Sequence, residues 1–239
     1  MNNFKEKFEF LEDGIDFPFY NDIPKLSVKE WSILAIVVIL FIFLSSLKGI
    51  PKIYHSTIYC LIMLIPALYI CKGNYSLFFK KPKLRNIKTI ILCYILYNIY
   101  TIAISIILKN IGYDVAPNIN TELTINFMFY LSIAIQLIGE EFFKIFILLI
   151  IMYVIYRFTN NRNLALYIGI IGTLLAFGLA HYSAYSGRIL QILLIQGLGS
   201  IFNLYAYMKT KNFVVSYTVH ILIDFTGFFL KSITTGYIC

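Results

Sequence analysis

Two adjacent carboxylates, Glu140 and Glu141, lie inside an otherwise apolar run that extends from residue 123 to residue 156. An ionised acid near the centre of a bilayer costs roughly 2.5–3.5 kcal/mol on insertion scales, so such residues usually face a bundle interior or a water-filled cavity. Two neighbouring carboxylates in a pocket of low dielectric cannot both ionise easily. One of them can therefore take a proton from water and pass it on near neutral pH.

Two of the three histidines lie in later apolar runs. His181 follows Phe177 by four residues, and His220 precedes Asp224 by four, so each pair lies on one helix face, one turn apart. A histidine can orient a water molecule or stabilise a developing oxyanion. A carboxylate one turn away can hold a second histidine in one tautomer. Together with the glutamates, these residues fit attack of water on an amide, which is peptide hydrolysis inside a membrane.

The same residues allow other interpretations. Two His and one Glu are a common ligand set for catalytic zinc, although the sequence lacks an H-E-x-x-H helix, so the ligands would come from three different spans. His181 could also be an interfacial histidine near a span end. His220 and Asp224 could be a polar pair that holds two helices together.

Lys144 offers a structural interpretation of the glutamates. It follows Glu140 by four residues in the favourable order, so the two could form a buried ion pair. That pair would leave Glu141 without a partner.

The composition places these residues in a membrane. Of the 239 residues, 59% are hydrophobic and only 13% are charged, which a soluble domain of this size could not bury. The net charge of +8 comes largely from short loops between apolar runs, so membrane topology explains it better than nucleic-acid binding. We expect a lipid bilayer and a peptide or membrane-protein substrate as partners, and no nucleic acid.

The apolar runs predict an all-α fold, a polytopic transmembrane helix bundle with seven or eight spans. The run at 123–156 has about 34 residues, near 50 Å of helix, which is long for a core of about 30 Å. A break at Gly139 would divide it and give the eighth span. The expected spans are 31–47, 53–71, 89–108, 123–156, 164–183, 189–208 and 213–230.

Three parts of one integrated membrane domain follow from this pattern. Residues 1–30 form an acidic, aromatic segment that is cytoplasmic or interfacial. Residues 31–122 form the N-terminal transmembrane helices, and residues 123–239 form the core that contains the candidate site. The loop at 72–88 has six basic residues and no acid, so it should be cytoplasmic and could touch anionic lipid.

Glu140-Glu141, then Phe177-x-x-x-His181, then His220-x-x-x-Asp224 resemble, in that order, the motifs of the CPBP family of intramembrane proteases. That family includes CAAX prenyl proteases of the Ras-converting type and bacterial homologues tied to bacteriocin immunity. The resemblance covers the C-terminal half, about residues 123–230.

The resemblance implies a hydrolase, with a role for each site residue. One of Glu140 and Glu141 would activate the water, and His181 would help to hold or activate it. His220 and Asp224 would contribute to the oxyanion site. The family has been described both as metalloprotease and as glutamate protease without metal, so a divalent metal such as zinc stays an open cofactor.

Two features depart from the expected arrangement. The family usually has an arginine four residues after its second glutamate, where this sequence has Ile145. The nearest cation, Lys144, should point about 100° away on a regular helix. By the rise per residue, His181 lies about 25 Å and His220 about 10 Å from the same end of their spans, so level helices would not bring them together.

The sequence thus predicts an intramembrane endopeptidase that cleaves a membrane-associated peptide or protein, with prenylated proteins among the candidate substrates. A catalytically silent scaffold, or a bacteriocin self-immunity protein, is the alternative. A proton or ion relay is a third hypothesis, which the lack of an inverted repeat disfavours. The few Ala and many Ile, Lys and Asn suggest an AT-rich genome. We therefore expect a multi-pass protein of a bacterial plasma membrane with a cytoplasmic N-terminus.

Overall fold

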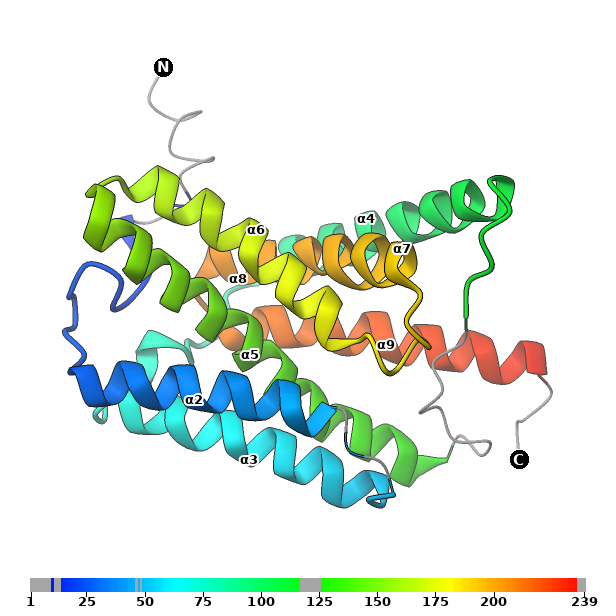
Figure 1. Ribbon diagram of the computed structural model, residues 1–239, viewed down its shortest axis with the longest axis horizontal. Coiled ribbons are helices and arrows are strands. Elements are labelled where there is room, and N and C mark those ends of the chain that lie inside the picture. Colours follow the sequence, from blue (N-terminus) through cyan, green and yellow to red (C-terminus); the bar gives the residue numbers. More distant parts are fainter. Residues whose placement is uncertain (1–9, 11–13, 46, 48, 117–125, 236–239) are drawn as a thin grey trace.

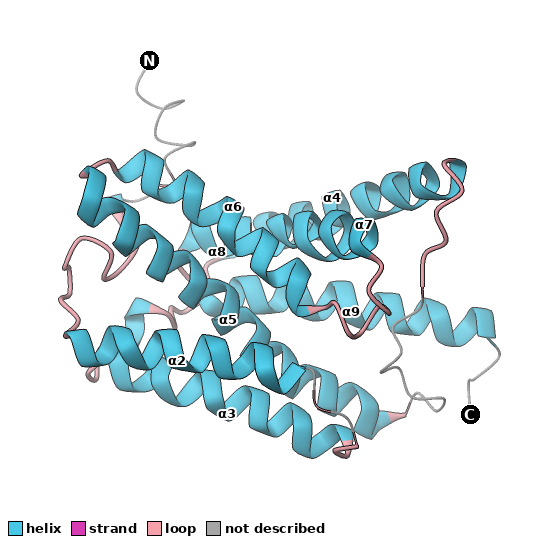
Figure 2. Cartoon of the chain, in the orientation of Figure 1, coloured by secondary structure: helices cyan, strands magenta, loops and turns pink. Residues whose placement is uncertain are grey.

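The computed structural model describes residues 10, 14–45, 47, 49–116 and 126–235. Within these residues the chain is all-helical and has no strand, as Figure 2 shows. Six stretches are long and apolar enough to cross a membrane, and a seventh long helix, α5, lies among them (Figure 1). The predicted all-α membrane bundle is confirmed.

The observed helices lie close to the predicted spans. Their bounds are α2 Val28–Ser45, α3 Lys52–Ile70, α4 Leu84–Asn110, α5 Phe127–Thr159, α6 Arg162–Ala180 and α9 Phe213–Thr235. The span before α9 is composite and consists of α7 (Ile189–Gln191), the π-helix η3 (Ile192–Gly197), the short 3-10 helix η4 (Leu198–Ser200) and α8 (Ile201–Thr210). A further 3-10 turn, η2 (Tyr75–Leu77), lies between α3 and α4.

Helix α5 is the centre of the bundle. It packs against α2, α3, α6 and α9, and every residue from Gly139 to Leu149 is buried. Asn126 caps its start by accepting the Phe129 N–H at 2.9 Å, and the left-handed residue Asn160 ends it. A helix that is apolar on all sides is expected to be buried on all sides. The surrounding helices therefore fix the position of the glutamate pair on α5.

The predicted break at Gly139 is wrong, because α5 continues through it as one helix of 33 residues. The structure therefore has no eighth span within the described residues. Gly139 serves a different purpose, since a Cβ placed there would lie 2.5 Å from the backbone oxygen of Tyr59 on α3. The glycine allows α3 and α5 to approach closely, one residue before the carboxylates.

Helix α4 lies at the periphery and packs on α8 and α9. Only 6% of its most apolar window is buried, the lowest share among the candidate spans. It begins at Leu84, five residues before the predicted start at Thr89, so the first basic residues of this helix belong to its first turns.

The N-terminal segment packs onto one end of the bundle. Phe17, Phe19 and Tyr20 are buried, and the Tyr20 ring meets Tyr156 of α5 at 5.0 Å between centroids. These aromatic side chains therefore pack against protein rather than facing the bilayer surface. Residues 1–9 and 11–13 of the predicted 1–30 segment, and the predicted boundary at 122/123, lie outside the described residues.

Candidate active site

Four of the five predicted site residues line one cavity of about 1010 Å³. They are Glu140 from α5, His181 from the end of α6, and His220 and Asp224 from α9. The fifth, Glu141, is not part of the cavity wall and is 1% exposed. The structure thus brings all three motifs to one place, with one glutamate facing the cavity and the other behind it.

Glu141 is surrounded by donors from three helices. Lys144 on α5 forms an ion pair with it, Ser216 on α9 donates its hydroxyl to it, and Asn203 Nδ2 on α8 lies 3.3 Å from Oε1. A buried carboxylate is tolerated when a cation and hydrogen bonds compensate for its lost hydration. Glu141 therefore has the environment of an ionised carboxylate that is fixed in place.

The predicted ion pair between Glu140 and Lys144 is wrong. Lys144 is fully buried and pairs with Glu141, three residues before it. Its ammonium group also lies 4.5 Å from the centroid of the Phe177 ring, a cation–π distance.

The expectation that Lys144 would point away from the glutamates is also wrong, because a long flexible side chain can reach back one turn. Ile145, at the position where the resemblance leads one to expect arginine, is fully buried in the apolar core. Lys144 supplies the cation beside the second glutamate instead.

His220 connects the buried glutamate to the cavity. Its Nδ1 lies 2.7 Å from Glu141 Oε1, although not in the alignment of a normal hydrogen bond. Its Nε2 lies 3.9 Å from Glu140 Oε2 and 3.8 Å from Asp224 Oδ1. One ring nitrogen therefore faces a fixed carboxylate, and the other faces the carboxylates of the cavity wall.

Of the two adjacent glutamates, Glu140 is the one that a water molecule in the cavity can reach. Its Oε1 accepts a hydrogen bond from Gln136 Nε2, one helical turn earlier, at 2.6 Å. The second oxygen is the one nearest to His220. Gln136 therefore orients the carboxylate group and leaves Oε2 directed at the histidine.

His181 directly follows Ala180, the last residue of α6, which fixes its position. Its Nδ1 lies 2.8 Å from the backbone oxygen of Phe177. Since a carbonyl oxygen only accepts hydrogen bonds, Nδ1 donates, and Nε2 is left as the acceptor. The Phe177 ring lies 4.7 Å from the His181 ring and 6.1 Å from the His220 ring, between centroids.

The predicted mismatch in depth between His181 and His220 does not keep them apart, because the helices are staggered. In Figure 1, α9 begins nearer to the middle of the molecule than the turn between α5 and α6 does. Both histidines line the same cavity in consequence.

Close helix packing fixes the end of α6. A Cβ at Gly178 would lie 2.6 Å from the backbone oxygen of Ile192, and one at Gly197 would lie 2.8 Å from that of Leu174. The two glycines therefore let α6 and the π-helix η3 meet backbone to backbone beside His181. Short π-helical segments are frequent at functional sites.

Sequence reasoning missed three residues of the site, Gln136, Asn203 and Ser216. Ser216, His220 and Asp224 are spaced by four residues, so a search of the last span for one polar face would have found Ser216. Asn203 is one of three amide side chains in the 189–208 run, and polar residues within an apolar span are themselves a signal of this kind.

The His and carboxylate side chains of the site do not converge on one point as a set of metal ligands. Among the residues that the structure describes, no three His, Cys, Asp or Glu side chains converge closely enough to hold a metal ion. Loss of peptide cleavage with a chelator would reveal a metal that these side chains bind.

Comparison with known families places this site in context. Residues 122–226 match the family described as Type II CAAX prenyl endopeptidase Rce1-like. This part of the chain is CAAX protease-like. The match includes all five predicted site residues and confirms the resemblance to CPBP-type intramembrane proteases. Neither the curated proteins nor the solved structures contain a match to the chain.

Proposed function

We propose that this CAAX protease-like protein is an intramembrane endopeptidase that hydrolyses a peptide bond in a membrane-associated peptide or protein. The observation that supports it is the position of His220, whose Nδ1 faces the buried Glu141 and whose Nε2 faces Glu140 across the cavity wall. A histidine oriented by one carboxylate and facing a second is an arrangement suited to activating water.

In the proposed reaction, water binds between Glu140 Oε2 and His220 Nε2, with His181 as a further acceptor. Glu140 takes one proton as the water oxygen attacks the carbonyl carbon of the scissile bond. The carbon–nitrogen bond then breaks, and Glu140 returns the proton to the leaving nitrogen. The products are a new carboxyl group and a new amine, and Glu140 is regenerated.

The other residues hold the His220 ring in place and do not take the proton from water. Glu141, compensated by Lys144, Ser216 and Asn203, holds the His220 ring in one orientation. Asp224, one turn further along α9, limits the rotation of the same ring from the cavity side. In this proposal His220 carries a proton on both ring nitrogens, because carboxylates face it on both sides. Its Nε2–H donates first to the water and then to the oxyanion, and His220 keeps this proton throughout the cycle.

The cavity favours a peptide as the substrate. Pockets for small molecules typically enclose about 300–1,000 Å³, and this one reaches about 1010 Å³. Its wall combines apolar side chains such as Phe41 and Ile133 with polar ones such as Asn98 and Gln196. A peptide segment attached to a lipid or to a membrane helix has both kinds of surface, which makes prenylated proteins one candidate class.

The alternative of a silent scaffold or self-immunity protein depended on Ile145 in the place of arginine. Because Lys144 provides a cation beside Glu141, that substitution is no reason to expect an inactive site. We therefore give the protease proposal precedence.

The test is proteolysis by the purified protein in liposomes. The substrates are farnesylated CAAX peptides, the same peptides without the farnesyl group, and short hydrophobic propeptides, each with and without a chelator. We expect cleavage of at least one membrane-associated peptide by the wild type and none by Glu140→Gln. Cleavage at equal rates by Glu140→Gln would refute the proposal, and loss of wild-type cleavage with chelator would add a metal to it.

We further propose a bacterial plasma membrane as the location, with the N-terminus and the loop at 72–88 in the cytoplasm. The positive-inside rule supports this orientation. A Lys81→Cys variant should be labelled by an impermeant maleimide only after cells are opened. Labelling in intact cells would reverse the orientation.

A further inference from the structure

The catalytic cavity reaches the surface at one end of the bundle, which we call the cavity end. Its wall includes Leu47, Gly49 and Pro51 from the connection between α2 and α3, and all three are exposed. Ser183 from the connection between α6 and α7 also lines the cavity, and its hydroxyl donates to the backbone oxygen of Ser45, the last residue of α2, at 3.1 Å. The mouth of the cavity is therefore formed by connections that meet at this end.

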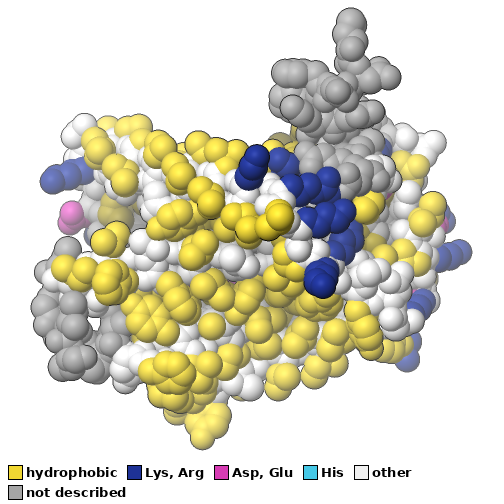
Figure 3. Space-filling view, turned by 180° about the vertical axis from the view of Figure 1, so that it is seen from behind, with side chains coloured by type: hydrophobic (Ala, Val, Ile, Leu, Met, Phe, Trp, Pro, Cys, Tyr) yellow, Lys and Arg dark blue, Asp and Glu magenta, His cyan; other side chains and the backbone are white. Residues whose placement is uncertain are grey.

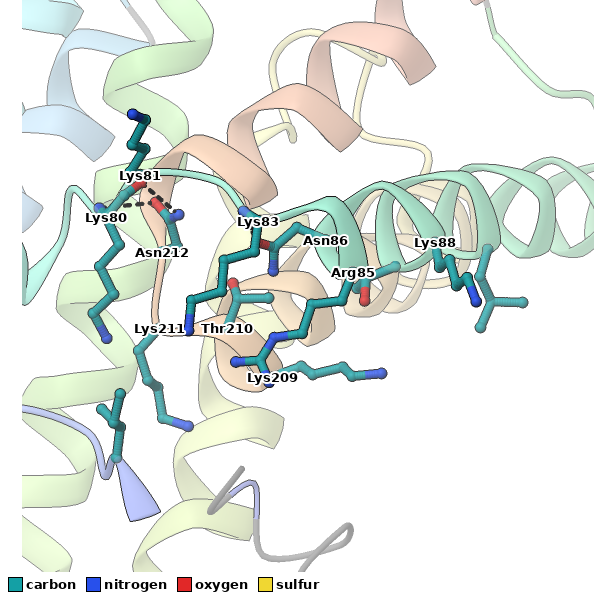
Figure 4. A pocket seen from close by; sticks show the side chains of 13 residues that line it. Lys80, Lys81, Lys83, Arg85, Asn86, Lys88, Lys209, Thr210, Lys211 and Asn212 are labelled. Atoms are coloured by element: carbon teal, nitrogen blue, oxygen red, sulfur yellow. Dashed lines mark hydrogen bonds between the residues drawn. The ribbon is translucent and has the colours of Figure 1, made fainter. Parts of the chain in front are cut away.

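The opposite end of the bundle, which we call the basic end, is assembled by contacts between distant segments. Lys72 Nζ, just after α3, lies 2.9 Å from Glu30 Oε1 at the start of α2. Asn212, in the turn between α8 and α9, donates from Nδ2 to the Lys80 oxygen at 2.8 Å. Figure 4 shows the basic side chains that gather where this turn lies beside the start of α4.

Aromatic side chains lie between the site and the basic end. Phe142 directly follows Glu141 and stacks on Phe213, with 4.3 Å between the ring centroids. Phe142 also meets Phe78 edge to face at 5.6 Å. All three rings are buried, and none of them lines the cavity. They fill the bundle on the basic side of the glutamate pair.

The cavity is continuous with the mouth and not with the basic end. His181, one of the site residues, lies only two residues before Ser183 of the mouth, and both line the cavity. Within the part of the chain that the structure describes, no residue of the connections at 71–83, 160–161 and 211–212 lines it. A substrate therefore has a route to the site from the cavity end.

The basic residues indicate on which side of the membrane this mouth lies. Connections on the cytoplasmic side are enriched in Lys and Arg, and acidic residues contribute little to orientation. Figure 3 shows Lys and Arg side chains gathered on one side of a broad hydrophobic surface. Among the described residues, the cavity end has Lys52, Lys109, Arg188 and Lys231. The basic end has Lys25, Lys29, Lys72, Lys80, Lys81, Lys83, Arg85, Lys88, Arg157, Arg162, Lys209 and Lys211. This asymmetry favours a cytoplasmic basic end and an extracytoplasmic mouth.

We propose that the substrate is a peptide segment of an exported or membrane-anchored protein, and that it enters the cavity from the extracytoplasmic side. This inference rests on the proposed function and on the proposed orientation of the chain. A prenylated protein anchored in the cytoplasmic leaflet would meet the basic end, where the buried rings of Phe78, Phe142 and Phe213 lie between it and the glutamates. The route of entry therefore narrows the substrate class to segments outside the cytoplasm.

Cysteine labelling in intact cells tests the side of entry without relying on activity. The background protein has alanine in place of all four native cysteines. Single cysteines are then introduced by Leu47→Cys at the mouth, Asn98→Cys on the α4 wall of the cavity, and Lys81→Cys at the basic end. The reagent is a small, charged methanethiosulfonate that does not cross membranes.

We expect Leu47→Cys and Asn98→Cys to react in intact cells, and Lys81→Cys to react only after the cells are opened. Gln196→Cys, on the η3 wall of the same cavity, serves if Asn98→Cys does not fold. Reaction of Lys81→Cys in intact cells would overturn the proposal, and so would reaction of the cavity variants only after opening. A mouth that reacts while neither cavity variant does would show that it does not lead to the site, with the same consequence.

A cleavage experiment separates this inference from the proposed function. The peptide that the wild type cleaves in liposomes is fused to one apolar helix in two orientations, which place it outside or inside the cell. We expect cleavage of the outer fusion and none of the inner fusion. Cleavage of the inner fusion alone, or of both equally, would overturn the side of entry and leave the proposed function standing. Cleavage of neither fusion, together with the expected cysteine pattern, would overturn the proposed function and leave the entrance as assigned.

Discussion

His220 on α9 places its Nδ1 2.7 Å from Oε1 of Glu141 on α5. This contact ties the last helix of the bundle to its central helix, 79 residues away in sequence (220 − 141 = 79). It gives the two adjacent glutamates different tasks. Glu141 orients the histidine from behind, and Glu140 acts from the cavity side.

The first prediction concerns the charge of Glu141. Glu141→Gln leaves the buried ammonium of Lys144 without its counter-ion, and breaking a buried ion pair by removing one partner costs roughly 3–5 kcal/mol. The variant should therefore have a much lower Tm, measured in detergent by the fluorescence of Trp31, which is the single tryptophan and stacks on Tyr153 at 4.3 Å.

A double variant separates the structural effect of Glu141 from its effect on activity. Glu141→Gln combined with Lys144→Met removes both charges and should recover most of the Tm. Its peptide cleavage should stay at least about 100-fold below wild type, because the histidine has lost the carboxylate that orients it. Recovery of activity together with stability would show that Glu141 has no part in the chemistry.

The second prediction concerns Ile145. Because its side chain is fully buried among apolar neighbours, Ile145→Arg would insert a second cation into the core beside the Lys144–Glu141 pair. We expect a loss of folded protein and no gain in cleavage, measured by size-exclusion chromatography and the peptide assay. A well-folded and more active Ile145→Arg protein would mean that Lys144 does not replace the arginine.

The third prediction tests the close approach of α3 and α5. Gly139→Ala places a Cβ 2.5 Å from the Tyr59 oxygen, so the two backbones must separate, at a cost of about 1–3 kcal/mol or more. Gly227→Ala on α9 is the matched control, because nothing lies within 4 Å of a Cβ there. The control should keep its Tm or gain slightly, since alanine favours helix by up to about 1 kcal/mol. Equal Tm values for the two variants would contradict the packing described for α5.

The fourth prediction concerns the N-terminal segment and pH. Asp16 pairs with Arg162, with Nη2 at 2.6 Å from Oδ1. Burial alone would raise the pKa of Asp16, but the hydrogen bonds from Arg162 and Tyr20 and the charge of Arg162 outweigh it and hold the pKa below the ordinary value. The pair therefore stabilises the fold above the unfolded-state pKa of about 3.9 and loses this contribution as pH falls through the lower folded-state pKa.

Thermal unfolding measured between pH 7 and pH 3 checks this sign. Asp16→Asn should have a lower Tm than the wild type at pH 7. The difference in Tm between the two proteins should be smaller at pH 3. A difference that grows as the pH falls would contradict the assigned direction.

Much of the fold could be predicted because long apolar runs separated by short basic loops leave few alternatives in a membrane. The ends of five predicted spans lie within four residues of the observed helix ends, while α9 continues to Thr235, five residues past its predicted end. The start of α4 was placed too late, because Arg85 and Lys88 were assigned to the loop, although charged side chains are tolerated in the first turns of a helix near the membrane surface.

The site was predicted less completely. The spacing of His220 and Asp224 placed them on one face of a helix. The position of the two glutamates inside a long apolar run identified them as candidate site residues. The sequence could not show which glutamate faces the cavity, because α5 is apolar all round and no polar stripe fixes its rotation. The stagger of α9 against α6, which brings His181 and His220 to one cavity, depends on packing and has no local sequence signal.

Single-turnover cleavage of one membrane-associated peptide by Glu140→Gln would decide whether Glu140 activates water, with Gln136→Glu as a variant on the same face of α5. Glutamine keeps the size of Glu140 but cannot accept the proton from water. We expect Glu140→Gln to keep the wild-type Tm and to cleave roughly 100-fold to 10,000-fold more slowly, and Gln136→Glu to lose less of the cleavage rate. A Glu140→Gln protein that cleaves at the wild-type rate would contradict the account, because the only glutamate of the pair that faces the cavity would then have no role in activating water.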